Sequence, residues 1–238
     1  MTPVTSRRHQ GLQWLGMIAA AALIAALIAT RGEAAVTTTL TITPQSVLLL
    51  NGRSNVADWR CSGQSMSGDA AVSAPLDQIN SIIDRIEDGN VAVFGQDMSR
   101  ATFPAPRFEM QIPVASFRCS GGRPMESDLK RALNAEQAPR ILFRFRELLG
   151  PVHHDIDRNI YQAKIAGSLT LAGITREIEV TVTAQRISRT LFRIQAMLPL
   201  KMTQFGITPP TALLGIVRAS DDLTVRFNVT LEAEGAGR

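Results

Sequence analysis

Residues 223–231 read Leu-Thr-Val-Arg-Phe-Asn-Val-Thr-Leu, an unbroken alternation of apolar and polar side chains. Successive side chains of a β-strand point to opposite faces of the sheet. The spacing therefore predicts a strand with one face in an apolar interior and the other in water. This stretch is the clearest of several that share its period, and it decides the fold class.

The same alternation recurs along most of the chain. Phe143 and Phe145, for example, alternate with arginines. Glycine-containing breaks at 171–173 and 206–215 separate the segments as turns or loops, which favours successive antiparallel strands. We therefore predict an all-β fold, and a chain of this length is typical of one barrel domain. The other strand segments are 46–50, 108–114, 141–146, 161–171, 178–184 and 192–202.

Two short segments have helical spacing instead. The first is 75–88, with Leu76, Ile79, Ile83 and Ile86, and the second is 124–135, with Met125, Leu129, Ala132 and Leu133. We expect both helices to cover an end or an edge of the sheet. An apolar stripe of this kind fits a helix that packs on the barrel, and it also fits a lid that gates it.

The N-terminal region has the order of a secretory signal peptide. Arg7 and Arg8 precede an apolar run at 15–30, and the small residues Gly32 and Ala34 follow. We expect residues 1–34 to be removed after Ala34, which leaves 35–238 as the mature domain. The alternative is an uncleaved membrane anchor, because the run is close to the length that spans a bilayer. Either way, the rest of the chain lies outside the cytoplasm.

The charge of the mature domain is small. The full chain has 25 Lys and Arg against 21 Asp and Glu, a net charge of +4, and loss of Arg7, Arg8, Arg31 and Glu33 leaves 22 − 20 = +2. These charges are spread along the chain without a basic block, so the sequence gives no indication of nucleic-acid binding.

The chain contains two cysteines, Cys61 and Cys119. Both follow the export signal, and disulfides persist outside the cytoplasm. We predict that they form a disulfide; two separate buried thiols are the alternative.

Four blocks of sequence follow one another in order. They are SVLLLNGRSNVADWRC at 46–61, IPVASFRC at 112–119 with MESDLKRALNA at 125–135 and PRILFRF at 139–145, GSLTLAGITR at 167–176, and FGITPPTALLG at 205–215. Together they resemble the YceI-like family of polyisoprenoid-binding, lipocalin-like periplasmic proteins, over residues 40–232. Ala57 stands where that family often has His, Gln204 stands where it often has Asp, and the 75–88 helix resembles an insertion.

The resemblance implies a lipocalin-like antiparallel barrel of about eight strands with an apolar interior, located in the periplasm. The implied function is to bind or carry a long apolar lipid, a polyisoprenoid or an isoprenoid quinone, without catalysis and without a cofactor. Such a barrel can hold one small ligand, or its side chains can fill it. In the second case it is a structural or protein-interaction module, and a cavity above roughly 300 Å³ distinguishes the two. A transient contact with a membrane surface is a further expectation, and the oligomeric state stays open.

The alternation of apolar and polar residues also predicts which side chains face the interior. Each of them is either a lining residue of a ligand cavity or ordinary core. An apolar chain in the cavity would gain roughly 0.8 kcal/mol for each buried CH₂. The lining candidates are Phe143, Phe145, Ile165, Leu169, Val180, Val182, Ile194, Phe227 and Val229.

Catalytic and metal-binding patterns are missing from the mature sequence. Its two histidines, His153 and His154, lie side by side in a polar stretch that we interpret as a hairpin loop. There is no Gly-x-Ser-x-Gly elbow and no His-Glu-x-x-His helix. We therefore predict no catalytic residues and no metal site.

Overall fold

The computed structural model describes residues 36–88, 106–150 and 152–234. Every element described below lies within Thr37–Arg238. The expected signal peptide and its cleavage site lie outside the described residues.

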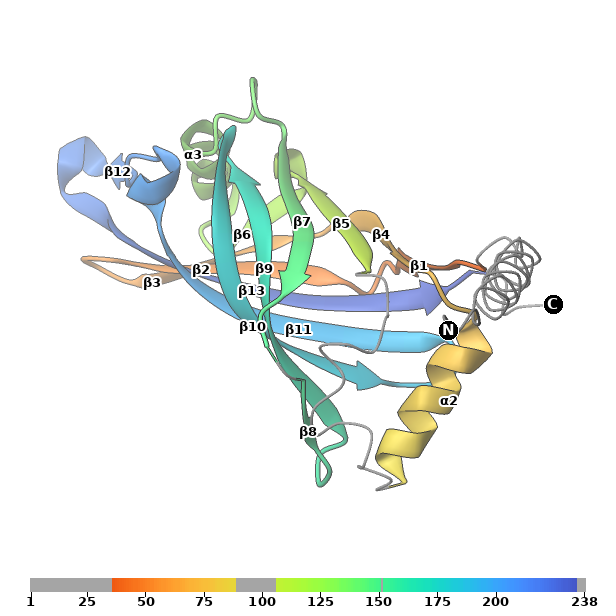
Figure 1. Ribbon diagram of the computed structural model, residues 1–238. Helices are drawn as coiled ribbons and strands as arrows, with labels where there is room; N and C mark the ends of the chain where they lie inside the picture. Colours follow the sequence, from red (N-terminus) through yellow and green to blue (C-terminus); the bar gives the residue numbers. More distant parts are fainter. Residues whose placement is uncertain (1–35, 89–105, 151, 235–238) are drawn as a thin grey trace, which may run out of the picture. The chain divides into compact units, whose positions relative to one another are not determined.

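Eight antiparallel strands form a closed ring (Figure 1), which confirms the predicted barrel. The ring closes where the first strand pairs with the last, with Leu40 opposite Ala233. In ring order the strands are β1 (Thr38–Ile42), β4 (Ser67–Val72), β5 (Arg107–Pro113), β7 (Arg140–Leu148), β9 (Ile160–Leu171), β10 (Ile174–Arg186), β11 (Leu191–Lys201) and β13 (Val217–Ala233).

The ring is extended by a second set of strands at one end. β13 has 17 residues, and its first part pairs with β2 (Val47–Ser54) rather than with β1. The sheet continues from β2 to β3 (Asp58–Gly63) and β6 (Phe117–Cys119). Two short strands, β8 (His153–Asp155) and β12 (Thr211–Ala212), pair with β9 and β13.

The predicted alternation appears directly in the burial of β13. Leu223, Val225 and Leu231 are almost fully buried, whereas Arg226 is exposed. Burying one such aliphatic side chain stabilises the fold by roughly 1.5–3 kcal/mol. The largest side chains with the least exposure form the filled part of the interior: Phe117, Phe205, Leu48, Leu50, Ile112, Leu169 and Val114.

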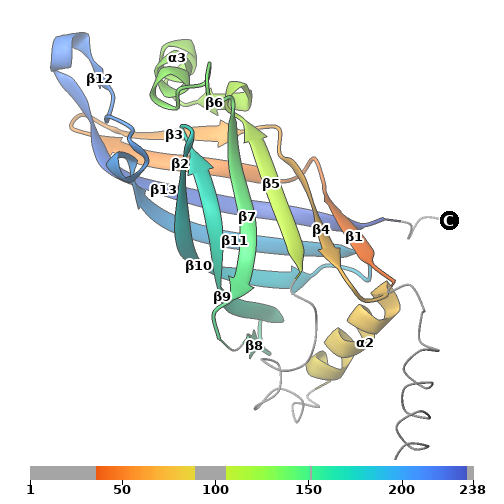
Figure 2. The same cartoon turned by 45° about the horizontal axis from the view of Figure 1, so that its top comes forward.

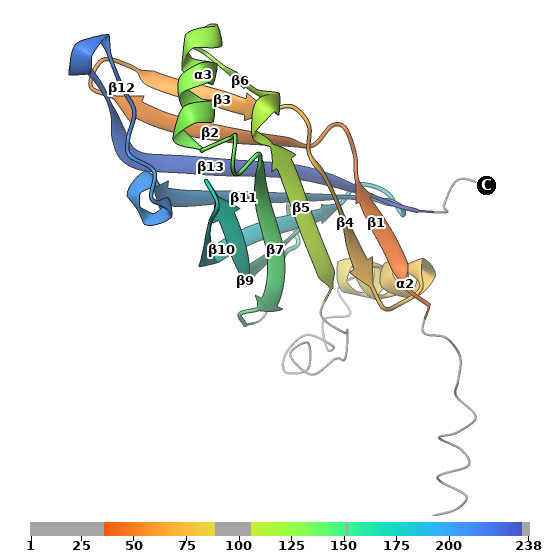
Figure 3. The same cartoon turned by 90° about the horizontal axis from the view of Figure 1, so that it is seen from above.

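Two helices cover the ends of the barrel, and they confirm the two helical segments of the sequence. They are α2 (Leu76–Glu87) and α3 (Gly122–Ala132). Figures 2 and 3 show them at opposite ends, with α2 beside β1 and α3 beside β6. Neither described helix is both long and apolar enough to cross a membrane.

A disulfide joins Cys61 to Cys119, as predicted. The two residues are direct partners in the pairing of β3 with β6. The bond therefore fixes the extension of the sheet next to α3.

Candidate functional site

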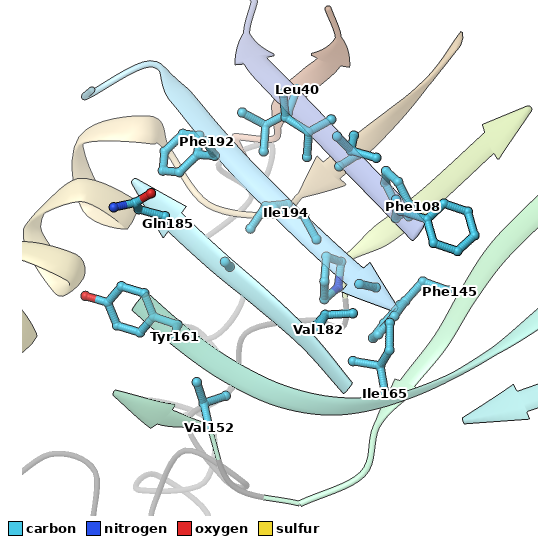
Figure 4. Close-up of a pocket in the computed structure, with 18 of the residues that line it drawn as sticks. Leu40, Phe108, Phe145, Val152, Tyr161, Ile165, Val182, Gln185, Phe192 and Ile194 are labelled. Carbon is cyan, nitrogen blue, oxygen red and sulfur yellow. The ribbon is translucent and has the colours of Figure 1, made fainter. Parts of the chain in front are cut away.

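The ring and α2 border a cavity of about 440 Å³ (Figure 4). This volume lies within the range of roughly 300–1,000 Å³ that is typical of ligand pockets. Aliphatic and aromatic side chains make up most of its wall, and no polar atom of the described lining residues is exposed to it. A space of this kind favours hydrocarbon over water.

Eight of the nine lining candidates from the sequence lie on the wall of this cavity. Leu169 is the ninth; it packs in the core and is 2 % exposed. It lies opposite Phe143 in the pairing of β7 with β9, towards the filled part of the barrel. The eight residues on the wall are Phe143, Phe145, Ile165, Val180, Val182, Ile194, Phe227 and Val229.

Strand register brings these side chains together. Val180 of β10 lies opposite Ile165 of β9, and Val182 lies opposite Ala163 on one side and Ala196 on the other. Ala196 itself lines the cavity, where a larger side chain would take up part of the volume. Small residues at inward positions thus help to leave the space open.

Helix α2 supplies one wall of the cavity. Its residues Ile79, Ile82, Ile83 and Ile86 all line the space. The helical spacing in the sequence predicted most of this stripe, but it did not predict which part of the structure the stripe contacts. The structure shows that the stripe borders a cavity, a role that the sequence-based candidates did not include.

The sequence-based candidates also omitted wall residues from the strands. The apolar alternation of 108–114 marked Phe108 and Met110 as inward-facing, and Tyr161 begins the alternation of 161–171. The alternation of apolar and polar residues in these two segments therefore already indicated the three residues. Phe192 also lines the cavity and begins the alternation of 192–202, whereas Leu40, another wall residue, precedes the first predicted strand segment (Figure 4).

A polar cluster attaches α2 to the end of β10. Arg186, whose side chain is only 14 % exposed, pairs with Asp84 at 2.6 Å and also pairs with Glu87. Arg189 contacts the other oxygen of Asp84 at 2.9 Å. Asn80 donates to the backbone carbonyl of Arg189 at 2.9 Å. These contacts hold the helix across the end of the cavity.

Burial and contacts in and beside this cluster shift the pKa values of Asp84, Arg186 and Tyr161. Hydrogen bonds from Arg186 hold the pKa of Asp84 below its usual range. Burial acts to lower the pKa of Arg186, but hydrogen bonds to Asp84 and Glu87 outweigh it and raise that pKa. Burial, with the negative charge of Glu87, raises the pKa of Tyr161 to about 12. Near neutral pH, Asp84 is therefore ionised, Arg186 is protonated and Tyr161 is neutral.

The two histidines lie close to this cluster. The Nε2 atom of His154 is 3.1 Å from Oδ1 of Asn159, and its ring stacks on Tyr161 with centroids 4.5 Å apart. Both histidines belong to the strand β8, paired with β9, and not to the hairpin loop that the sequence predicted; His153 is exposed there. Among the described residues, no three His, Cys, Asp or Glu side chains are grouped so that they could hold a metal ion.

A second cavity, of about 460 Å³, lies at the α3 end. Met125 and Leu129 of α3 form one side of it, and Trp59 of β3 and Val217 of β13 belong to its wall. The lining of this cavity has no residue in common with that of the first.

The closed antiparallel ring with an apolar interior defines an all-β barrel of the lipocalin-like class. The sequence model of the YceI-like domain matches residues 63–231, and the chain belongs to this family. No curated protein matches the sequence.

The solved structures of similar fold include the following two. BcnA of Burkholderia cenocepacia is 18% identical, with a TM-score of 0.51 over 78% of this chain and 96% of that one. A polyisoprenoid binding domain from Saccharophagus degradans, described as implicated in plant cell wall breakdown, is 13% identical. Its TM-score is 0.54, and the match covers 82% of this chain and 98% of that domain. At these identities the likeness concerns the fold.

Proposed function

We propose that the protein binds or carries a long apolar lipid, a polyisoprenoid or an isoprenoid quinone, in the cavity of the ring. The observation that carries this proposal is the cavity of about 440 Å³ with an apolar wall. Each CH₂ moved from water into such a space gains roughly 0.8 kcal/mol. The polyisoprenoid binding domain of similar fold supports this class of ligand.

The polar residues of the lining lie at one end of the cavity. Tyr161, Gln185 and Arg186 lie together at the α2 end, because Tyr161 begins β9 and the other two end β10. Figure 4 shows Tyr161 and Gln185 on the side opposite Phe108 and Phe145. Because no polar atom of these residues is exposed to the cavity, the hydrocarbon chain occupies the cavity and a polar headgroup lies beyond its α2 end.

The protein acts in the bacterial periplasm and has no catalytic activity of its own. Its residues 1–34 have the order of an export signal, and a disulfide suits an oxidising compartment. The polar side chains at the α2 end are engaged in ion pairs that hold a helix, which supports a binding role over a catalytic one.

The competing function is that of a filled barrel, a structural or protein-interaction module without a ligand. The volume of the cavity opposes it, because a filled barrel would leave no space near 440 Å³.

The test is organic extraction and mass spectrometry of protein purified from the periplasm without detergent. We expect one long-chain isoprenoid lipid in the extract. Ala196→Phe fills part of the cavity and should reduce the bound lipid at least tenfold, which corresponds to about 1.4 kcal/mol.

Met197→Phe is the matched control. Met197 is the next residue on β11 and points out of the barrel, 59% exposed. This variant should keep its lipid. A lipid-free extract from folded wild-type protein, together with no uptake of added isoprenoid alcohol, would leave the filled-barrel function as the better account.

A further inference from the structure

Large aliphatic side chains project into solvent at the end of the barrel that carries β12. Val56, in the turn between β2 and β3, is 64% exposed; Leu214 is 106% exposed, and Ile216 is 69% exposed. The last two lie between β12 and β13. We call residues 53–60 and 211–218 together the tip. Isolated apolar residues are normal on a surface, but three on adjacent loops require an explanation.

Asn55 connects the two segments of the tip, 53–60 and 211–218, by hydrogen bonds. Its Nδ2 donates to the carbonyl of Ile216 at 2.8 Å, and its Oδ1 accepts from the backbone N–H of Arg218 at 2.8 Å. The backbone N–H of Asn55 also donates to the carbonyl of Arg218 at 3.1 Å. The turn that carries Val56 and the loop that carries Leu214 and Ile216 are therefore held side by side (Figure 3).

The charge of the tip is positive. It contains three arginines, Arg53, Arg60 and Arg218, all exposed, and one acid, Asp58, so its net charge is 3 − 1 = +2. Asp58 lies 3.4 Å from Arg53 and offsets one of the arginines. The next acids along β13 are engaged elsewhere, because Asp221 accepts from Thr203 and Asp222 pairs with Lys201.

The second cavity lies directly behind the tip. Val56, Ala57, Ala212 and Val217 of the tip are part of its wall. A surface that contacts the tip would therefore lie beside an apolar space of about 460 Å³.

We propose that the tip docks on the surface of an anionic lipid bilayer. Aliphatic side chains enter the boundary between headgroups and acyl chains, and basic side chains stay with the phosphates. The tip provides both on adjacent loops. Docking goes beyond the binding of a lipid in the ring cavity, since it assigns the face through which the barrel meets its membrane, and it does not depend on that cavity being occupied.

The test is co-sedimentation with vesicles of phosphatidylcholine containing roughly one-third phosphatidylglycerol, at low salt. The chain starts at Ala35, so that it keeps every described strand but lacks the apolar run at 15–30. We expect binding that falls at least tenfold in the double variant Leu214→Asp, Ile216→Asp. Binding should also fall severalfold on vesicles of phosphatidylcholine alone.

Ile156→Asp is the matched control. Ile156 is 66% exposed and lies between β8 and β9, away from the tip, so this variant should bind as the unaltered chain does. Thermal melting confirms that each variant is folded. The proposal is overturned if the unaltered chain does not sediment, if the tip variant binds equally well, or if the control loses binding to the same extent. It is also overturned if the tip variant converts a dimer to a monomer, because a second copy of the chain would then be the partner.

Discussion

Gly167 shows how closely single residues are fitted on the wall of the barrel. A Cβ atom at this position would lie 2.6 Å from Cε2 of Phe143 and 2.7 Å from the carbonyl oxygen of Arg144. Because one of these atoms belongs to the backbone, the methyl group cannot be accommodated by rotating a side chain. The glycine therefore allows the Phe143 ring to lie against β9.

We expect Gly167→Ala to destabilise the fold by about 1–3 kcal/mol through overpacking. At roughly 2–4 °C for each kcal/mol in a domain of this size, the melting temperature should fall by several degrees. Ser168→Ala, at the neighbouring half-buried position, should have little effect. Equal melting temperatures for Gly167→Ala and the wild-type protein in calorimetry would contradict this account of the packing.

At the residue scale, the sequence predicts which side chains face inward but not what they meet. Ile165 and Leu169 share one face of β9, yet Ile165 lines the cavity and Leu169 is core. The difference depends on the side chains that other strands and turns contribute, because a small residue such as Ala196 lines the cavity and a large one such as Phe205 fills the core. The alternation of apolar and polar residues within a strand contains no information on contacts between residues so distant in sequence.

At the scale of elements, the position of α2 depends on Arg186. Its side chain is 14% exposed, whereas that of Arg189, which shares Asp84, is 69% exposed. Hydrogen bonds of a buried charged group contribute about 1.5–3 kcal/mol, and an exposed ion pair contributes about 0–1 kcal/mol. The two arginines therefore differ in how much they hold the helix.

We predict that Arg186→Met increases amide hydrogen exchange in residues 76–87 by at least tenfold, since the helix loses its attachment to β10. Arg189→Met should increase it only slightly. Hydrogen-exchange mass spectrometry of both variants checks this order. Equal exchange in the two variants would show that the apolar stripe alone holds α2.

The attachment of α2 also depends on pH. The pKa of Asp84 is lower in the folded protein than in the unfolded chain, where it is about 3.9. Its contribution to stability is therefore complete above that value and is lost as the pH falls through the lowered, folded pKa. Protection of residues 76–87, corrected for intrinsic exchange, should stay constant from pH 7 to pH 5 and decrease below roughly pH 4. A decrease between pH 7 and pH 5 would point to a different group.

The helices and most strands could be predicted because each has a local period. The interruption between β5 and β6 could not. β5 is separated from β6 by a 3₁₀ turn at Val114–Ser116. Apolar residues continue through this turn, at Val114, Ala115 and Phe117, so the hydrophobic pattern alone does not locate it.

At the scale of the whole molecule, the disulfide ties β3 to β6 across a sequence separation of 58 residues. Closing a loop of this length should stabilise the fold by roughly 4 kcal/mol. We predict that the double variant Cys61→Ser, Cys119→Ser melts about 10 °C lower than the wild-type protein. A shift below about 2 °C would mean that packing beneath α3 already fixes this end of the sheet.

Closure of the barrel was expected from the resemblance to the YceI-like family and not from the hydrophobic pattern of the sequence. Alternation predicts strands, but the ring exists because the last residues of β13 pair with β1 while its first residues pair with β2. β13 can pair with both strands because it has 17 residues. The cavity likewise results from the closed ring together with α2, and neither is a local property of the sequence.

The central claim is that an apolar lipid lies inside the ring, and methyl NMR tests it most directly. Isoleucine methyl groups are labelled in the lipid-free protein, and a C₂₀ isoprenoid alcohol is added. The account predicts saturable shifts at Ile83, Ile165 and Ile194, which line the cavity, and none at the exposed Ile156. Unchanged signals at the three cavity residues at saturating lipid, or shifts confined to other sites, would contradict it.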